Sequence, residues 1–257
     1  MNLTRTSNPI FGKSFERNIG TTYAEEQMTV KGTMNKTGLI LLFVLASAYF
    51  TWQKFYDAYT PENPLAAVSA LKMYMLIGGI GGFITAIIAS FSPRKAGFFT
   101  PVYAIFEGMF LGGLSAMFEA QYPGLVIRAV ALTFAVFLGM LLIYRQQIIK
   151  VTGTFRKGMI AAIFGITLVY LVGWIAGMFG ANIGFLQGNG TFGLIFSLIV
   201  TGISAFSLLL DFDFIEQGAR AGAPKYMEWY SVFGLLVSLV WLYINILRLL
   251  SIFSSRD

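Results

Sequence analysis

Long apolar stretches separated by short polar breaks dominate the chain from residue 38 onward. A helix needs about 20 mainly apolar residues to cross a bilayer, and the apolar stretches reach that length. The pattern predicts spans at residues 38–56, 70–91, 98–118, 126–144, 158–180, 192–212 and 231–253. We therefore expect an all-α membrane protein, built as a bundle of seven transmembrane helices.

The breaks between the predicted spans contain residues that end helices. Pro and Gly cost little at a water interface, and they occur in the breaks at 60–64, 92–95, 122–124 and 222–225. The uncharged stretch 181–191 is interpreted as a short loop. Residues 1–36 are polar and predict a solvated tail, with a transmembrane domain over 37–257. Because no apolar stretch precedes Leu39, we expect no cleavable signal peptide.

Basic residues are distributed unevenly between the breaks. If the N-terminus is inside, thirteen of the 18 Lys and Arg residues fall in inner segments: Arg5, Lys13, Arg17, Lys31, Lys36, Arg94, Lys95, Arg145, Lys150, Arg156, Lys157, Arg220 and Lys225. The outer segments hold the other five: Lys54, Lys72, Arg128, Arg248 and Arg256. Cytoplasmic loops of membrane proteins carry an excess of Lys and Arg. This bias predicts a cytoplasmic N-terminus and a C-terminus outside.

Composition excludes several classes of function. Of the 257 residues, 56% are hydrophobic and 12% are charged, and the chain has neither His nor Cys. A Ser-His or Cys-His catalytic unit, a His or thiolate zinc site and a disulfide are therefore excluded. The net charge of +6 is explained by membrane topology rather than by nucleic-acid binding. We expect no enzyme activity, no cofactor and no nucleic-acid partner, with the lipid bilayer as surroundings.

Small residues spaced by four predict close helix packing within the bundle. Helices in lipid associate through such flat faces, because lipid tails are as apolar as leucine. The pairs in this chain are Gly78 with Gly82, Gly108 with Gly112, and Gly173 with Gly177. They favour a helix bundle and say nothing of a specific function.

Seven of the twelve acidic residues fall in the predicted tails or water-facing loops, which leaves five to interpret. Glu107 is in the middle of the third span, where an ionised carboxylate costs about 2.5 kcal/mol or more. It is interpreted either as a protonated acid that hydrogen-bonds between helices or as a group in a proton or cation pathway. Asp211 and Asp213 are at the inner end of the sixth span. Glu216 and Glu228 follow, and with Asp213 they are secondary acidic candidates.

Hydroxyl side chains lead along the sixth predicted span to Asp211. Steps of four, three, three and four residues place on one helix face Ser197, Thr201, Ser204, Ser207 and Asp211. Such a face suits a narrow hydrated pathway and equally suits hydrogen bonding between helices. Asp213 is about 200° around the helix from Asp211, so the two are not expected to share a site. Because calcium takes six to eight oxygen ligands, Asp211 could form only a weak calcium site, and no tight metal site is expected.

Several motifs resemble the Bax inhibitor-1 family. They are Tyr103-Ala-Ile-Phe-Glu-Gly-Met-Phe-Leu-Gly in the third span, Asp211 at the end of the sixth, and Leu236-Val-Ser-Leu-Val-Trp-Leu-Tyr-Ile-Asn-Ile-Leu in the last. The segments 211–218 and 222–230 are similar to a bacterial branch, and the resemblance covers roughly 37–253. It implies a bundle whose last helix is surrounded by the others, in a bacterial cytoplasmic membrane. It also implies a passive calcium leak controlled by protons on two aspartates.

The sequence departs from that family pattern at the second aspartate. The first aspartate corresponds to Asp211, but the matching position in the last helix is Leu242. Leucine can neither share a proton nor bind calcium, so the implied two-aspartate gate cannot be carried over intact. Glu228, near Asp211, Asp213 and Glu216 at the inner face, and Glu107 on a neighbouring helix remain alternative partners.

Two functions follow from the residues and the resemblance. The first, which we favour, is a proton-sensitive flux of cations or calcium, with Asp211 as gate and with Glu107, Thr201, Ser204 and Ser207 along the path. The second is a regulator without transport, because bacterial relatives are implied to bind a membrane-anchored ATP-dependent protease. The missing second aspartate favours the regulator, whereas Glu107 and the hydroxyl face favour transport. The sequence does not indicate an oligomeric state.

Overall fold

A computed structural model describes residues 27–60, 64–180 and 190–255 of the chain. Over these residues the helices are α2 (Val30–Ala58), α3 (Pro64–Phe91), α4 (Ala96–Gln121), α5 (Leu125–Arg145), α6 (Gly153–Met178), α8 (Thr191–Arg220) and α9 (Tyr226–Ser254). A 3-10 turn, η1 (Pro93–Lys95), precedes α4. All seven α-helices are long and apolar enough to cross a membrane, and the described ranges contain no strand. The predicted seven-helix, all-α fold is confirmed.

The helices extend beyond the predicted spans, chiefly where three of them meet at one end of the bundle. α2 begins at Val30, inside the segment predicted as tail, α8 continues to Arg220, and α9 begins at Tyr226. The 30 residues of α8 make a helix about 45 Å long, which exceeds the ~30 Å hydrocarbon core of a bilayer. Hydropathy did not predict these helix ends, because their residues are largely polar. Residues 1–26 and 181–189, for which a tail and a loop were predicted, lie outside the described ranges.

Local side chains fix several helix ends. The Thr29 hydroxyl accepts a hydrogen bond from Gly32 N–H at 2.9 Å and caps α2, as N-cap threonines commonly do. At the start of α5, Gly124 has a φ of 79°, a conformation that favours glycine. The Glu119 carboxylate accepts hydrogen bonds from the Gly124 and Val126 N–H groups at 2.6 and 2.9 Å. Glu119 therefore stabilises the turn between α4 and α5.

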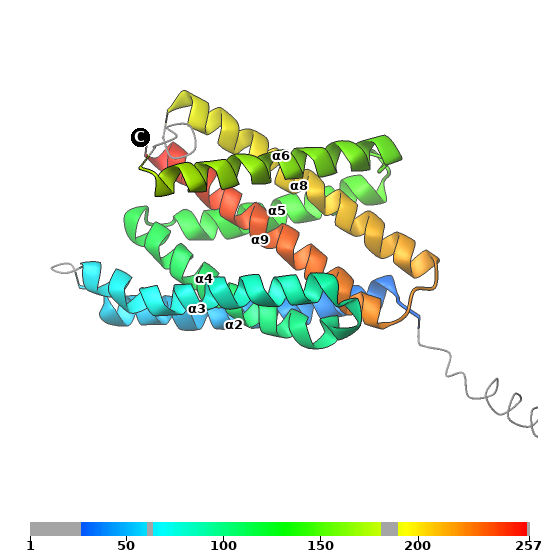
Figure 1. Ribbon diagram of the computed structural model, residues 1–257, viewed down its shortest axis with the longest axis horizontal. Helices are drawn as coiled ribbons and strands as arrows, with labels where there is room; N and C mark the ends of the chain where they lie inside the picture. Colours follow the sequence, from blue (N-terminus) through cyan, green and yellow to red (C-terminus); the bar gives the residue numbers. More distant parts are fainter. Residues whose placement is uncertain (1–26, 61–63, 181–189, 256–257) are drawn as a thin grey trace, which may run out of the picture.

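α9 is the central helix of the bundle. It packs against α2, α3, α4, α5 and α8, and Figure 1 shows it crossing obliquely between the α2–α4 layer and the layer of α5, α6 and α8. Its side chains Leu235, Leu242 and Leu247 are fully buried. The expectation that the last helix is surrounded by the others is thereby confirmed.

Glycines bring α4 close to two neighbouring helices. A Cβ atom built on Gly78 of α3 would lie 2.7 Å from a backbone oxygen of α4, and one on Gly108 would lie 2.5 Å from the Val44 carbonyl oxygen of α2. The small residue at each position therefore permits the contact. Gly177 differs, because a Cβ atom there would meet nothing within 4 Å. The packing role predicted for Gly177 is wrong, since this part of α6 faces away from the other helices.

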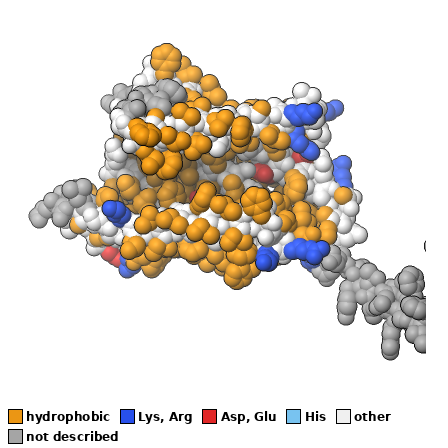
Figure 2. Space-filling view, viewed as in Figure 1, with side chains coloured by type: hydrophobic (Ala, Val, Ile, Leu, Met, Phe, Trp, Pro, Cys, Tyr) orange, Lys and Arg blue, Asp and Glu red, His pale blue; other side chains and the backbone are white. Residues whose placement is uncertain are grey.

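Charged and apolar side chains divide the surface as a bilayer requires. Figure 2 shows Lys and Arg gathered at the end where α2 and α9 begin and α5 and α8 end. We call this the basic end; it includes Lys36, Arg145, Arg156 and Arg220 and is the end predicted to be cytoplasmic. Along the flanks, large apolar side chains such as Phe83, Phe164 and Trp174 are 63–68% exposed. A surface of this kind implies surrounding lipid.

Candidate functional site

A cleft of about 370 Å³ between α6, α8 and α9 contains Asp211. Its other polar lining residues include Arg156 from α6, Gln217 from α8 and Ser231 from α9. Figure 2 looks into a hollow between apolar ridges in which acidic atoms are visible. We call the space around these residues the Asp211 cleft. It lies near the basic end, because Arg156 is in the first turn of α6 and Ser231 is in the second turn of α9.

One carboxylate oxygen of Asp211 is buried without a hydrogen-bond partner. Among the described residues, Asp211 Oδ2 and Ser231 Oγ are both inaccessible to solvent and unpaired. Ser238 of α9 lies close to the Asp211 side chain, and a Cβ atom built on Gly234 would lie 3.8 Å from Asp211 Oδ1. Buried polar atoms are nearly always satisfied by protein, water or an ion. The two unpaired oxygens therefore make this cleft the strongest candidate for a site that binds a proton, water or a cation.

Asp213 belongs to a separate ion-pair cluster. Its Oδ2 atom accepts hydrogen bonds from Arg156 Nη2 at 2.6 Å and from Gln217 Nε2 at 2.8 Å. It lines a polar cavity of about 220 Å³ together with Glu216 and not with Asp211. The two aspartates thus face different spaces, as their angular separation on the helix predicts. Arg156 links them, because it pairs with Asp213 while lining the Asp211 cleft.

Glu216 connects α8 to α5 at the edge of the same polar cavity. One of its carboxylate oxygens accepts a hydrogen bond from the Tyr144 hydroxyl at 2.5 Å, and the other pairs with Arg220 one turn later. Both oxygens are occupied by these contacts. Glu216 therefore has a structural role in this conformation and does not reach Asp211.

Glu228 joins the start of α9 to the start of α2. Its carboxylate is 1% exposed and accepts hydrogen bonds from the Thr29 N–H and hydroxyl at 2.9 and 3.0 Å. It also pairs with Lys36, whose Nζ atom lies 5.0 Å from the centroid of the Trp229 ring. A Cβ atom on Gly32 would collide with this carboxylate. The structure thus pairs Glu228 with Lys36 rather than with an aspartate of α8.

Glu107 lies on α4 and faces α3, away from the Asp211 cleft. Its side chain lies close to Tyr103 one turn earlier, and a Cβ atom built on Gly82 of α3 would be 3.0 Å from its Oε2 atom. Because α9 separates α4 from α8 in the bundle, the structure does not bring Glu107 and Asp211 together. Glu107 is also absent from the residues that line the Asp211 cleft.

The hydroxyl residues of α8 lie on one largely buried face that includes contacts with α9. Ser197, Ser204 and Ser207 are 0–4% exposed, and the Thr201 hydroxyl is 3.5 Å from the Asn245 carbonyl oxygen of α9. The hydroxyls of Thr201, Ser204 and Ser207 donate to carbonyl groups of their own helix at 2.7–2.8 Å. Their common face is therefore observed. In this conformation the hydroxyl protons of Thr201, Ser204 and Ser207 are bound to the backbone, whereas the Ser197 hydroxyl is buried without a hydrogen-bond partner among the described residues.

Comparison with models of known protein families assigns the chain to a family. A family model described as Bax inhibitor 1 like matches residues 8–255. The chain belongs to the Bax inhibitor 1-like family. A search of curated proteins and a search of solved structures each found no match. Because the family match covers nearly the whole chain, it confirms the resemblance in the sequence motifs and supports a multi-pass membrane protein.

This Bax inhibitor 1-like protein has an apolar core at the position implied for a second aspartate. Leu242 is fully buried and packs in a cluster with Leu208 and Leu209 of α8. The polar group that α9 offers to Asp211 is instead the hydroxyl of Ser238, one turn earlier. Sequence analysis missed this partner, although Ser238 lies one turn after Gly234 on the same helix face.

Two ion pairs of this Bax inhibitor 1-like protein were also missed. Arg156 and Lys36 were assigned only to the inner segments that set topology, and each pairs with an acid far along the chain. The sequence showed only that both basic residues lie near the ends of predicted helices. That position does not identify the acidic residue with which each one pairs.

Proposed function

We propose that this protein permits a passive, proton-sensitive flux of cations across the membrane, with calcium as the candidate ion. Asp211 is the principal gating or binding group in this proposal. The observation that carries it is the buried, unpaired Oδ2 atom of Asp211 in a cleft between three membrane-spanning helices. Acidic groups at such places are costly unless paired, neutral or beside water, and they commonly mark ion or proton pathways.

The chemistry of the cleft fits transit of calcium better than its storage. Asp211 offers a single carboxylate, and the nearby Ser231 and Ser238 add two hydroxyl oxygens. Calcium is normally held by six to eight oxygens. Within the described ranges, no group of three or more acidic side chains could hold a metal ion. Residence in the cleft is therefore brief, which a pathway requires.

Proton sensitivity follows from the charge of Asp211. The ionised side chain attracts a cation into the cleft, and the protonated side chain does not. Arg156 at the same cleft is paired with Asp213, so loss of the Asp211 charge leaves the described lining of the cleft with no uncompensated negative charge to attract a cation. We infer that flux falls as pH falls.

Glu107, Thr201, Ser204 and Ser207 are proposed to line the path in its open form. Glu107 is on α4 and the hydroxyls are on α8, and these two helices lie on opposite sides of α9 (Figure 1). A path that includes both therefore requires a displacement of α9 from the arrangement described above. Each of these hydroxyls donates its proton to a helix carbonyl, so its oxygen can still accept a hydrogen bond from the water shell of a passing cation.

Calcium uptake into sealed proteoliposomes tests this proposal. We expect the native chain to carry calcium at neutral pH and Asp211→Asn to reduce the rate at least tenfold. Asp57→Asn is the matched control, because Asp57 is an exposed aspartate near the end of α2, with a side chain that is 63% exposed. Uptake equal to that of empty vesicles would contradict the proposal, as would equal loss in both variants.

A second candidate function is regulation of a membrane-anchored ATP-dependent protease. The burial of Leu242 favours it, because Asp211 has no carboxylate partner on α9. Deletion of residues 1–26 is the appropriate test, since it leaves the Thr29 and Lys36 contacts with Glu228 in place. Loss of co-purifying protease with unchanged calcium flux would support this function. For both candidate functions, we propose that the basic end faces the bacterial cytoplasm.

A further inference from the structure

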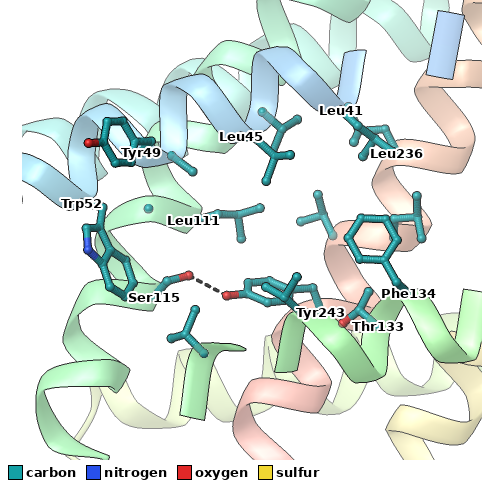
Figure 3. A pocket seen from close by; sticks show the side chains of 17 residues that line it. Leu41, Leu45, Tyr49, Trp52, Leu111, Ser115, Thr133, Phe134, Leu236 and Tyr243 are labelled. Carbon is teal, nitrogen blue, oxygen red and sulfur yellow. Dashed lines mark hydrogen bonds between the residues drawn. The ribbon is translucent and has the colours of Figure 1, made fainter. Parts of the chain in front are cut away.

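α2 and α5 enclose an apolar groove in the membrane-spanning part of the bundle. The space is about 330 Å³ and is lined by α2, α4, α5 and α9. Figure 3 shows Leu45 of α2 above it and Trp52 of α2 at its left end, with Leu111 of α4 and Tyr243 of α9 around it. Phe134 of α5 lies near its other end. Side chains from four helices thus form a single apolar space.

A second space follows the same two helices at the basic end. It is about 570 Å³ and is lined by Val30 and Met34 of α2, by Leu141 and Arg145 of α5, and by residues of α8. Along α2 the lining residues of both spaces advance through positions 30, 34, 41, 45, 48 and 52. Steps of three, four and seven residues keep one helix face. The two spaces share no lining residue within the described ranges, and we call them together the α2–α5 groove because both follow this face of α2.

The deep part of the groove offers an apolar ligand little competition from water. The Ser115 and Tyr243 hydroxyls hydrogen-bond to each other at 2.7 Å, as Figure 3 shows. The Thr133 hydroxyl donates to the Ala129 carbonyl oxygen of its own helix at 2.7 Å. Cavities whose lining is apolar and whose polar groups are satisfied stay dry and accept hydrocarbon. An alkyl chain therefore suits this space.

The basic end of the groove carries positive charge at its rim. Arg145 is exposed and has no ion pair with the described residues. Arg220 is also at the rim, with a side chain that is 77% exposed. Glu216 contributes the one negative charge there, and its oxygens are bound to Arg220 and Tyr144. One net positive charge remains, and guanidinium groups bind phosphate well.

We propose that the α2–α5 groove binds one anionic phospholipid from the leaflet at the basic end. The phosphate lies between Arg145 and Arg220, and an acyl chain follows the apolar lining of α2 and α5 toward Trp52. Basic pockets between membrane-spanning helices on the cytoplasmic side bind anionic headgroups in this way. The proposal does not depend on cation flux through the Asp211 cleft.

Native mass spectrometry of the full chain, released from vesicles with equal amounts of phosphatidylglycerol and phosphatidylcholine, tests this site. We expect one retained phosphatidylglycerol, favoured over phosphatidylcholine by about fivefold, the factor for one basic residue near a membrane surface. Arg145→Gln should abolish the preference. Lys157→Gln should retain it, because Lys157 is an exposed basic residue in the first turn of α6, away from the groove.

The acyl-chain part of the proposal has its own pair of variants. Leu45→Trp places an indole in the groove and should lower retention of both lipids. Leu142→Trp is the control, because Leu142 is 56% exposed on α5 and does not line the groove. Val130→Phe fills the groove from α5 and repeats the test if Leu45→Trp does not yield folded protein.

The outcomes separate a lipid from other occupants. Displacement of the retained lipid by excess inorganic phosphate would show a headgroup site alone and overturn the proposal. Equal loss of preference in Arg145→Gln and Lys157→Gln would also overturn it, because the effect would then be general surface charge. Dimers that disappear with Leu45→Trp, without any retained lipid, would show that a second copy of the chain occupies the groove.

Discussion

The Asp213 carboxylate holds the Arg156 guanidinium at the cleft that contains Asp211, with 2.6 Å between Oδ2 and Nη2. Asp213 is therefore a positioning residue for a positive charge, although it faces a different cavity from Asp211. A cation that enters the cleft is attracted by Asp211 and repelled by Arg156, whose charge Asp213 partly neutralises. The balance between the two controls entry.

Removal of that positive charge should increase cation flux. We expect Arg156→Gln to raise calcium uptake by about fivefold, or about 1 kcal/mol. This is less than the full Coulomb repulsion at this range, because the ion pair with Asp213 already neutralises part of the Arg156 charge. Proteoliposome uptake measures the change, with Lys157→Gln as the neighbouring control on α6. A flux that is unchanged or lower in Arg156→Gln, with normal folding, would show that this arginine does not control entry.

Two glycines of α2 should respond oppositely to the same substitution. Gly32→Ala places a Cβ atom against the Glu228 carboxylate and displaces it from Thr29 and Lys36, whereas a Cβ atom on Gly38 meets nothing within 4 Å. We expect Gly32→Ala to lower the free energy of unfolding by about 1–3 kcal/mol. Gly38→Ala should leave it unchanged or raise it, because alanine favours helix. Thermal unfolding in detergent compares them, and equal melting temperatures would refute the structural role of Glu228.

A carboxylate placed at the family's second aspartate position should destabilise this protein. Leu242 is fully buried among leucines, so an ionised side chain there has no compensating partner. We expect Leu242→Asp to unfold more readily than Leu242→Asn at neutral pH, by about 2 kcal/mol or more. The difference should narrow at low pH, because protonation removes the buried charge. Equal stability of the two variants across pH would show that the position is hydrated.

Much of the fold could be predicted because hydropathy and helix periodicity are local properties. The seven spans required only about 20 apolar residues each, and the common face of Ser204, Ser207 and Asp211 required only the helix repeat. The polar first turns of α2 and α9 were missed because they project beyond the apolar core of a membrane. Their helical state depends on tertiary contacts such as Lys36 with Glu228.

The candidate site was predicted less completely than the fold. Asp211 was identified because a carboxylate at the end of an apolar span is rare. Its actual neighbours, Arg156 and Ser238, come from two other helices. Helix rotation and the choice of packing partners determine such neighbours, and neither can be obtained from spacing within one segment. For the same reason, the sequence could not show that Glu107 faces α3, away from the cleft that contains Asp211.

Calcium flux into sealed proteoliposomes between pH 5.5 and pH 8 tests the central claim most directly. The account predicts that flux through the native chain rises with pH as Asp211 ionises, and that Asp211→Asn gives a low flux with little pH dependence. Ser238→Ala should retain pH dependence, because the carboxylate remains. A native flux that does not change with pH, or an unaltered pH profile in Asp211→Asn, would contradict the role assigned to Asp211.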